Sequence, residues 1–286
     1  MATGARSLAV AGSISAVGGV ALLSSSSGGG GSSSSTHCAG SPQYTLRYFP
    51  VPGAPGEVIR LLLVLSEGEG NWKDEVTGMK SSPPWKEVKP TTKWGQMPVL
   101  YTADGKEMTQ SRAIARFLAA KMAVPGGGAS GSFFGGPPKL LPANNPELCF
   151  QADEIVEALE DVRYKIVKTF AIKDQAEKEA ARAALFVPGG DIYEGFKKID
   201  AVIAANGSGG GFSVGSAFSL ADFWAFVCVN QFRAGFLDGV PKDGAWLEDM
   251  PQLKAVVENV AAIPALKSYY AGKAAASKLY APFVAK

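Results

Sequence analysis

Two short stretches of this chain combine residue types that can hold an anionic, peptide-like ligand. The first, residues 94–100, reads as a turn that enters a strand and contains Met97-Pro98, where an unusual peptide geometry would expose backbone groups. The second opens a helix at Gln110 and Ser111. Backbone N–H groups in the first turn of a helix are free and together carry about half a positive charge, so they bind anions. With Ser111 as N-cap, this helix start predicts a carboxylate pocket; an ordinary cap without a ligand is the alternative.

Three more side chains lie on segments that flank this pocket in sequence. Tyr48 ends an aromatic-rich strand, residues 44–49, and precedes a loop rich in proline and glycine. A tyrosine hydroxyl near helix N-termini can donate a hydrogen bond to a thiolate or oxyanion and so lower the pKa of that group. Packing in the core is the alternative for Tyr48. Trp85 and Lys89, four residues apart, would share one face of a helical turn beside the pocket, or else form a surface aromatic and a solvated lysine.

An acidic stripe follows in the second half of the chain. Asp153, Glu157 and Asp161 recur every four residues, so on a helix they stack on one face and repel each other. Such a stripe requires a cation nearby. The candidates are a partner subunit, the ammonium group of a ligand, and Lys165 four residues further on.

Composition narrows the possible chemistry. The chain has 286 residues, 47% of them hydrophobic and 19% charged, as in a globular protein. Its only histidine, His37, lies in a Ser/Gly tract, which excludes Ser-His-Asp chemistry and most transition-metal sites, so we expect no metal. Cys38, Cys149 and Cys228 form no CxxC pair, and a net charge of +2 without a basic cluster argues against nucleic acid as a partner.

The elements that would position these residues form two domains. Residues 43–123 read as strand, helix, strand, hairpin and helix, which predicts a small thioredoxin-like α/β domain. The corresponding segments are a strand at 44–49, a loop at 50–56, a helix at 57–66, a helical turn at 85–88, a hairpin of 98–101 and 106–108, and a helix at 111–122. Residues 124–145 read as a Gly/Pro-rich linker, whose insert at 126–142 has no evident purpose.

Residues 146–286 are predicted to be entirely helical. Apolar residues keep a helical period from Asn145-Pro146 to residue 170, and further helices are predicted at 174–186, 191–205, 223–232 and 251–262. Ser219 and Asp222 form a capping box with Phe218 and Phe223 as a hydrophobic staple, to which we assign a structural role.

Residues 1–42 are predicted to lie outside the fold. They contain no acidic residue and combine a short apolar run with a Ser/Gly tract. This pattern is typical of a cleaved signal or transit peptide, and a membrane anchor or a disordered tail are the alternatives. The pattern does not select the compartment, so a secretory, organellar or, without targeting, cytoplasmic location stays open.

Four motifs in this order resemble the cytosolic-type glutathione transferases, with the sigma class, which includes glutathione-dependent prostaglandin D synthase, as the best match. They are Tyr44-Thr45-Leu46-Arg47-Tyr48-Phe49, Gly95-Gln96-Met97-Pro98-Val99-Leu100, Gln110-Ser111-Arg112-Ala113-Ile114-Ala115-Arg116-Phe117-Leu118 and Ser219-Leu220-Ala221-Asp222. The resemblance covers residues 44–282. It implies a thioredoxin-like domain followed by a helical domain, a homodimer, and glutathione as co-substrate for the conjugation of a small hydrophobic electrophile.

The resemblance also implies roles for individual residues. Tyr48 matches the tyrosine that stabilises the glutathione thiolate. The other implied glutathione contacts are Trp85 and Lys89 at the glycine end, Gln96, Met97 before a cis Pro98 at the cysteinyl part, Gln110 and Ser111 at the γ-glutamyl carboxylate, and Asp161 from the partner subunit at the γ-glutamyl ammonium.

One departure from the family concerns the loop after Tyr48. Sigma-type chains place arginines there, whereas residues 51–56 read Val-Pro-Gly-Ala-Pro-Gly, one residue longer and without a charge. This change leaves thiolate activation to Tyr48. A glutathione transferase is therefore the expected function; a non-catalytic binding or structural module of the same fold, or a glutathione-dependent isomerase, are the alternatives.

Overall fold

The computed structural model describes residues 42–53, 55–78, 81, 83–122, 140–141, 145–206 and 211–284. The expected leader and most of the expected linker, including nearly all of the 126–142 insert, lie outside these residues. The predictions made for them therefore stay predictions.

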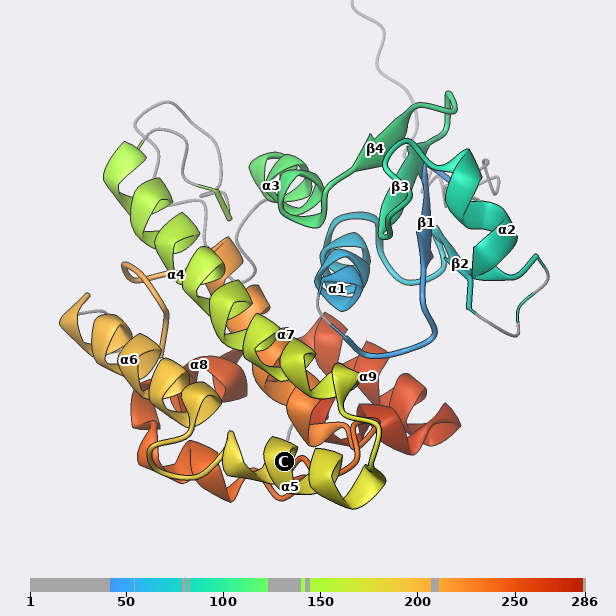
Figure 1. Cartoon of the computed structure of the whole chain (residues 1–286). Helices are drawn as coiled ribbons and strands as arrows, with labels where there is room; N and C mark the ends of the chain where they lie inside the picture. Colours follow the sequence, from blue (N-terminus) through green and yellow to red (C-terminus); the bar gives the residue numbers. More distant parts are fainter. Residues whose placement is uncertain are drawn as a thin grey trace, which may run out of the picture. The chain divides into compact units, whose positions relative to one another are not determined.

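A four-stranded sheet forms the first half, in the order β2-β1-β3-β4 (Figure 1). Its strands are β1 (Tyr44–Tyr48), β2 (Lys73–Val76), β3 (Val99–Thr102) and β4 (Glu107–Thr109). β1 pairs parallel with β2 and antiparallel with β3, and β3 pairs antiparallel with β4. Three helices accompany the sheet: α1 (Gly56–Glu67), the short α2 (Trp85–Val88) and α3 (Ser111–Lys121). The order β-α-β-hairpin-α confirms the thioredoxin-like prediction.

The hydrophobic pattern of the sequence explains these elements. Side chains of β1 alternate between buried and half-buried, as the period of two requires. Leu61, Leu62 and Leu63 of α1 are all fully buried, because this helix is covered on one side by the sheet and on the other by the helical half. Gly105 closes the β3–β4 hairpin with φ near +81°, a conformation that glycine adopts without steric cost.

The second half is helical, as predicted. It contains α4 (Pro146–Tyr164), α5 (Gln175–Ala184), α6 (Asp191–Ala205), α7 (Leu220–Arg233), α8 (Pro251–Ala261) and α9 (Pro264–Ala276). One boundary was wrong: the helix predicted to reach residue 170 ends at Tyr164 and continues as a 3₁₀ segment, Lys165–Ala171. In this segment the Thr169 hydroxyl donates a hydrogen bond to the carbonyl of Ile166, a local alternative to helical pairing. α9 was not predicted.

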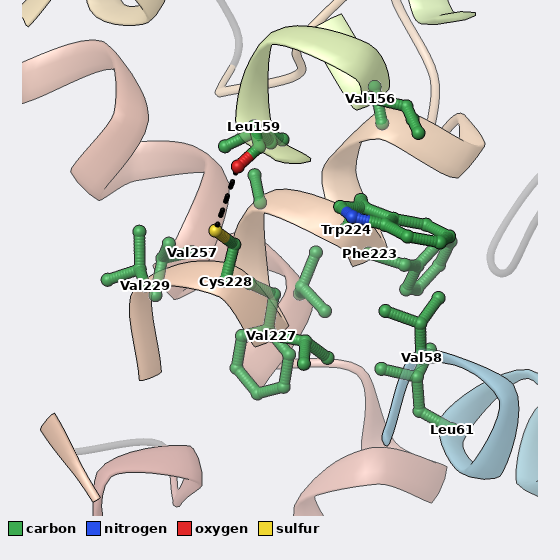
Figure 2. Packing of buried hydrophobic residues seen from close by; sticks show 14 of the residues in the cluster. Val58, Leu61, Val156, Leu159, Phe223, Trp224, Val227, Cys228, Val229 and Val257 are labelled. Atoms are coloured by element: carbon green, nitrogen blue, oxygen red, sulfur yellow. Dashed lines mark hydrogen bonds between the residues drawn. The ribbon is translucent and has the colours of Figure 1, made fainter. Parts of the chain in front are cut away.

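One hydrophobic core joins the two halves. Figure 2 shows Val58 and Leu61 of α1 near Phe223 and Trp224 of α7, and all four side chains are fully buried. The thiol of Cys228, also on α7, lies 3.5 Å from the carbonyl oxygen of Leu159, and burial raises the pKa of this thiol (Figure 2). A thiol in that state is a poor nucleophile, so Cys228 serves packing.

The capping box at the start of α7 is confirmed. The fully buried Asp222 carboxylate accepts hydrogen bonds from the backbone N–H of Ser213 at 2.6 Å, the backbone N–H of Ser219 at 2.7 Å and the Ser219 hydroxyl at 2.8 Å. The rings of Phe218 and Phe223, the predicted staple, have centroids 5.8 Å apart. Asp222 therefore fixes both the helix start and the loop that leads to it.

Candidate functional site

A cavity of about 660 Å³ lies between the first half of the fold and helix α4. Six residues that the sequence predicted for the site line it together: Trp85, Gln96, Met97, Pro98, Gln110 and Ser111. They come from α2, the segment before β3, and the start of α3. The fold thus brings together segments that are up to 26 residues apart in sequence.

The start of α3 forms the part of the wall that suits an anion. Ser111, Arg112 and Ala113, the first three helical residues, all line the cavity, and no side chain caps the helix. Their backbone N–H groups are donors that the helix itself leaves unpaired. A carboxylate at this position would accept from these donors and meet the positive end of the helix dipole.

The predicted N-cap was wrong by one residue. Gln110 is the N-cap, with φ near +67°, and Ser111 is the first helical residue. A positive φ is uncommon outside glycine and often accompanies a functional site. The turn at Gln110 places its side-chain amide 3.4 Å from the Gln96 side-chain oxygen, so two predicted ligand residues meet across the cavity wall.

The peptide bond between Met97 and Pro98 is cis, as the resemblance implied. Both residues line the cavity. Lys89, in contrast, does not: it is exposed and packs its side chain against Gly95, one residue before Gln96. Its predicted contact with a ligand stays a prediction.

Tyr48, the predicted catalytic residue, does not itself line the cavity. Its side chain is only 7% exposed, while its neighbour Phe49 and the loop residue Pro55 line the cavity itself. Burial raises the pKa of the Tyr48 hydroxyl. The nearby charge of Arg163, the charge of Arg60 and a hydrogen bond from the backbone N–H of Gly56 act in the opposite direction. The net direction keeps this hydroxyl protonated, and thus a hydrogen-bond donor, at neutral pH.

Ion pairs between α3 and α4 form the charged side of the cavity, and the sequence interpretation missed them. Arg116 pairs with Asp153 at 2.8 Å, and Arg112 pairs with Glu157 at 3.1 Å. The hypothesis that Lys165 balances the acidic stripe is thus wrong for these two carboxylates, whose cations come from α3. The spacing of four between the two arginines was the available signal.

A second set of missed residues lies one turn further along α4. Glu160 is 3% exposed and accepts two hydrogen bonds from Arg163, from Nε at 2.9 Å and from Nη2 at 2.7 Å. The indole N–H of the buried Trp224 donates to the same carboxylate at 3.0 Å. Glu160 and Arg163 both line the cavity, with Tyr164 beside them.

Asp161, predicted to act across a dimer interface, does not line this cavity. It borders a separate hollow of about 370 Å³ between α4 and α6, together with Val162, Gly195 and Ile199. Asp161 therefore does not contribute to the cavity lined by Phe49 and Ser111 in its own chain, and its role stays a prediction.

Two properties of the described part of the chain bear on other functions. It contains no group of three or more His, Cys, Asp or Glu side chains placed to hold a metal ion. Among the helices that are described, none has the length and apolar character needed to cross a bilayer.

Comparison with known proteins matches both halves of the fold. Residues 44–120 match the family model "Glutathione S-transferase, N-terminal domain", and residues 160–273 match "Glutathione S-transferase, C-terminal domain". A probable glutathione S-transferase 8 of Caenorhabditis elegans is 33% identical, over 76% of this chain and 90% of the relative. Glutathione S-transferase 2 of Manduca sexta is 28% identical, over 80% of this chain and 95% of the relative.

Solved structures agree with this result. The structure of prostaglandin synthase D of Nilaparvata lugens superposes with a TM-score of 0.59 at 26% identity, over 80% of this chain and 96% of that one. Together with the two matched domains and the cavity between sheet and α4, these likenesses identify the chain as a member of the glutathione S-transferase family.

Proposed function

We propose that this protein transfers the glutathione thiolate to a small hydrophobic electrophile in the cavity between the sheet and α4. One observation carries this proposal: the uncapped first turn of α3 lines the same cavity as Phe49, the residue that directly follows the buried Tyr48. The helix start suits the carboxylate of a peptide, and the Tyr48 hydroxyl suits a thiolate. The homologues that match over most of their length are named glutathione S-transferases.

The binding part of the site holds glutathione along its length. The γ-glutamyl carboxylate accepts hydrogen bonds from the start of α3, beside Gln110 and Ser111. The backbone of Met97 pairs with the cysteinyl part, while Trp85 and Lys89 contact the glycine end. Holding the peptide at both ends directs its sulfur toward Phe49 and the adjacent Tyr48.

The chemical part of the site ionises the thiol and places it against the electrophile. Tyr48 stays protonated because burial raises the pKa of its hydroxyl, so the hydroxyl can donate a hydrogen bond to the thiolate. The proton of the thiol leaves to solvent. Phe49, Pro55 and Tyr164 form an apolar wall beside this point, where a hydrophobic electrophile is held in reach of the sulfur.

Replacing Tyr48 with phenylalanine tests the chemical part. Loss of one hydrogen bond to an anion costs about 1.5–3 kcal/mol, so kcat/KM for conjugation of glutathione to an aryl halide should fall roughly 10- to 100-fold at neutral pH. Steady-state kinetics of the full chain and the Y48F variant measure this change. The glutathione dissociation constant should change little, because the γ-glutamyl and glycine ends keep their contacts.

Two outcomes would contradict this assignment. Equal kcat/KM in both proteins would remove Tyr48 from its role. Tight glutathione binding without turnover by the unmodified chain would instead favour a binding or structural module with the same fold.

The active form is proposed to be a homodimer in which Asp161 reaches the γ-glutamyl ammonium bound by the partner subunit. Asp161 lies outside the glutathione cavity of its own chain, beside an apolar hollow between α4 and α6, and this position supports the proposal.

The D161N substitution should weaken glutathione binding roughly fivefold, because the loss of one exposed ion pair costs about 1 kcal/mol of binding free energy. Calorimetry measures the dissociation constant, with E147Q at the exposed start of α4 as the matched control. Sedimentation of the full chain as a monomer would contradict the dimer.

A sigma-class assignment is the finer part of the proposal. The structural likeness to prostaglandin synthase D of Nilaparvata lugens supports it, because glutathione-dependent prostaglandin D synthase belongs to that class. The uncharged loop after Tyr48 argues that conjugation rather than prostaglandin isomerisation is the reaction.

A further inference from the structure

The loop after Tyr48 offers no cation to a thiolate. Residues 50–56 contain only proline, valine, glycine and alanine. A thiolate beside Phe49 therefore needs its positive partner from another element. The cavity lining contains five charged residues that bear on this point, Arg112 and Arg116 from α3 and Glu157, Glu160 and Arg163 from α4.

The arginines of α3 are paired with carboxylates of α4. Arg116 pairs with Asp153 at 2.8 Å and with Glu157 at 3.4 Å. Arg112 pairs with Glu157 at 3.1 Å and more distantly with Glu160, at 3.9 Å. Arg60 lies under the ring of Tyr48, with its guanidinium carbon 5.5 Å from the ring centroid. It is only 1% exposed, is bound to carboxylates of α1 and β2, and does not line the cavity. Neither arginine of α3 is among the charges that act most strongly on the Tyr48 hydroxyl, and Arg60 does not line the cavity.

Arg163 is positioned to do so. It lines the cavity with Phe49 and Pro55, and its side chain is 16% exposed, so a bound ligand can reach it. Within the described part of the chain both of its hydrogen bonds go from Nε and Nη2 to Glu160, which leaves Nη1 without a partner there. Of the charged groups that act on the Tyr48 hydroxyl, Arg163 has the largest effect and lowers the pKa of that hydroxyl. The charge of Arg163 therefore reaches the Tyr48 hydroxyl, and its side chain shares the cavity with Phe49, the next residue in the chain.

A buried support holds this guanidinium in one position. The carboxylate of Glu160 takes two hydrogen bonds from Arg163 and one from the indole N–H of Trp224, which is fully buried in the core. The guanidinium carbon of Arg163 also lies 4.5 Å from the centroid of the Tyr164 ring. A two-point contact with a carboxylate that is itself anchored restricts the arginine far more than a single surface ion pair does.

We propose that Arg163, held by Glu160 and Trp224, supplies the positive charge that stabilises the glutathione thiolate in this protein. This inference rests on the proposed glutathione transfer. Arg163 acts on the reacting sulfur, while Glu160 and Trp224 act through Arg163 as positioning residues. Thiol ionisation releases one proton to solvent, and the resulting S⁻ lies between the Tyr48 hydroxyl and the guanidinium.

Removing the charge of Arg163 and removing the carboxylate that holds it test the proposal separately. The pKa of the bound glutathione thiol is measured by titrating the ultraviolet absorbance of the thiolate in complexes of the full chain. R163M should raise this pKa by about one unit, which lowers the thiolate fraction about tenfold at a pH below it. E160Q should also raise the pKa, but by less than R163M does, because Arg163 keeps its charge and loses only the carboxylate that holds it in position. R163K should give an intermediate value, since an ammonium group keeps the charge but cannot bond to Glu160 at two points.

The matched control is K254M, which removes one cation from an exposed ion pair with Glu248 and thus changes the net charge of the protein as R163M does. It should leave the thiol pKa unchanged. An R163M complex with the pKa of the unmodified protein would overturn the proposal. If R163M does not fold, E160Q decides, because an unchanged or lowered thiol pKa in that variant would overturn the proposal that Glu160 holds Arg163 beside the thiolate.

Failure of the underlying function has a different signature. An unmodified chain that binds no glutathione, or whose bound thiol titrates as in free glutathione, would overturn both proposals. An active unmodified chain with an unaffected R163M variant would overturn only the role of Arg163.

Discussion

Replacing Asp222 with alanine is expected to lower the free energy of unfolding by about 4 kcal/mol. The substitution leaves two buried backbone N–H donors without an acceptor, at a cost of about 1–3 kcal/mol each, and removes hydrogen bonds to a charged group. The backbone N–H groups of Ser213 and Ser219 both donate hydrogen bonds to this carboxylate, and Asp222 has no solvent exposure. A loss of this size is a large part of the about 5–15 kcal/mol that stabilises a typical domain. Urea unfolding followed by circular dichroism measures it.

Ser219→Ala serves as the matched control for this effect. It removes a hydroxyl from the same capping box but leaves both backbone donors paired with Asp222, so it should cost only about 1 kcal/mol. If D222A were no more destabilising than S219A, the carboxylate would not be the anchor of the loop at Ser213, and the role assigned to the capping box would be wrong.

Replacing Gly56 with alanine is expected to damage both stability and catalysis. A Cβ at this position would lie 2.0 Å from Cδ1 and 2.3 Å from Cε1 of the Tyr48 ring, far inside contact distance. The ring is buried and cannot swing into solvent, so the extra methyl group should cost about 1–3 kcal/mol of stability. It should also displace the Tyr48 hydroxyl, and a shift of about 1 Å in a catalytic group can lower kcat/KM by roughly 100-fold.

The sign of the stability change makes this prediction specific. Alanine is a better helix former than glycine, so without the contact G56A would stabilise α1. Gly272, in the middle of α9, has open space around it, and G272A should stabilise the protein by about 0.5–1 kcal/mol without changing kinetics. A G56A variant that behaves like G272A in thermal unfolding and in the conjugation assay would show that Tyr48 does not occupy the position described.

Local patterns predicted most of the fold. The capping box at Ser219 and Asp222, the helix start at Asn145 and the hairpin at Gly105 were all found, because each depends on residues within a few positions of each other. The end of α4 was misjudged, since apolar spacing continues through the 3₁₀ segment that follows Tyr164. The N-cap was placed at Ser111 instead of Gln110, because the residue type of Gln110 does not indicate its positive φ.

The binding half of the site was also predictable, while its charged half was not. Part of the binding site belongs to short motifs that can be recognised from the sequence alone. The fold places these residues along one cavity: Gln96, Met97, Gln110 and Ser111. Glu160 and Arg163 acquire a role only through Trp224, which is 61 residues further along the chain from Arg163. Such a network depends on tertiary packing between α4 and α7, and no local spacing signals it.

The ionisation state of glutathione bound to the full chain tests the central claim most directly. We predict that glutathione binds in the cavity and that, in a difference absorbance spectrum near neutral pH, a substantial fraction of the bound sulfur is thiolate. Free glutathione under the same conditions is almost entirely thiol, since an unperturbed cysteine thiol has a pKa of about 8.5. A complex in which glutathione is bound and yet titrates as it does in water would contradict this claim.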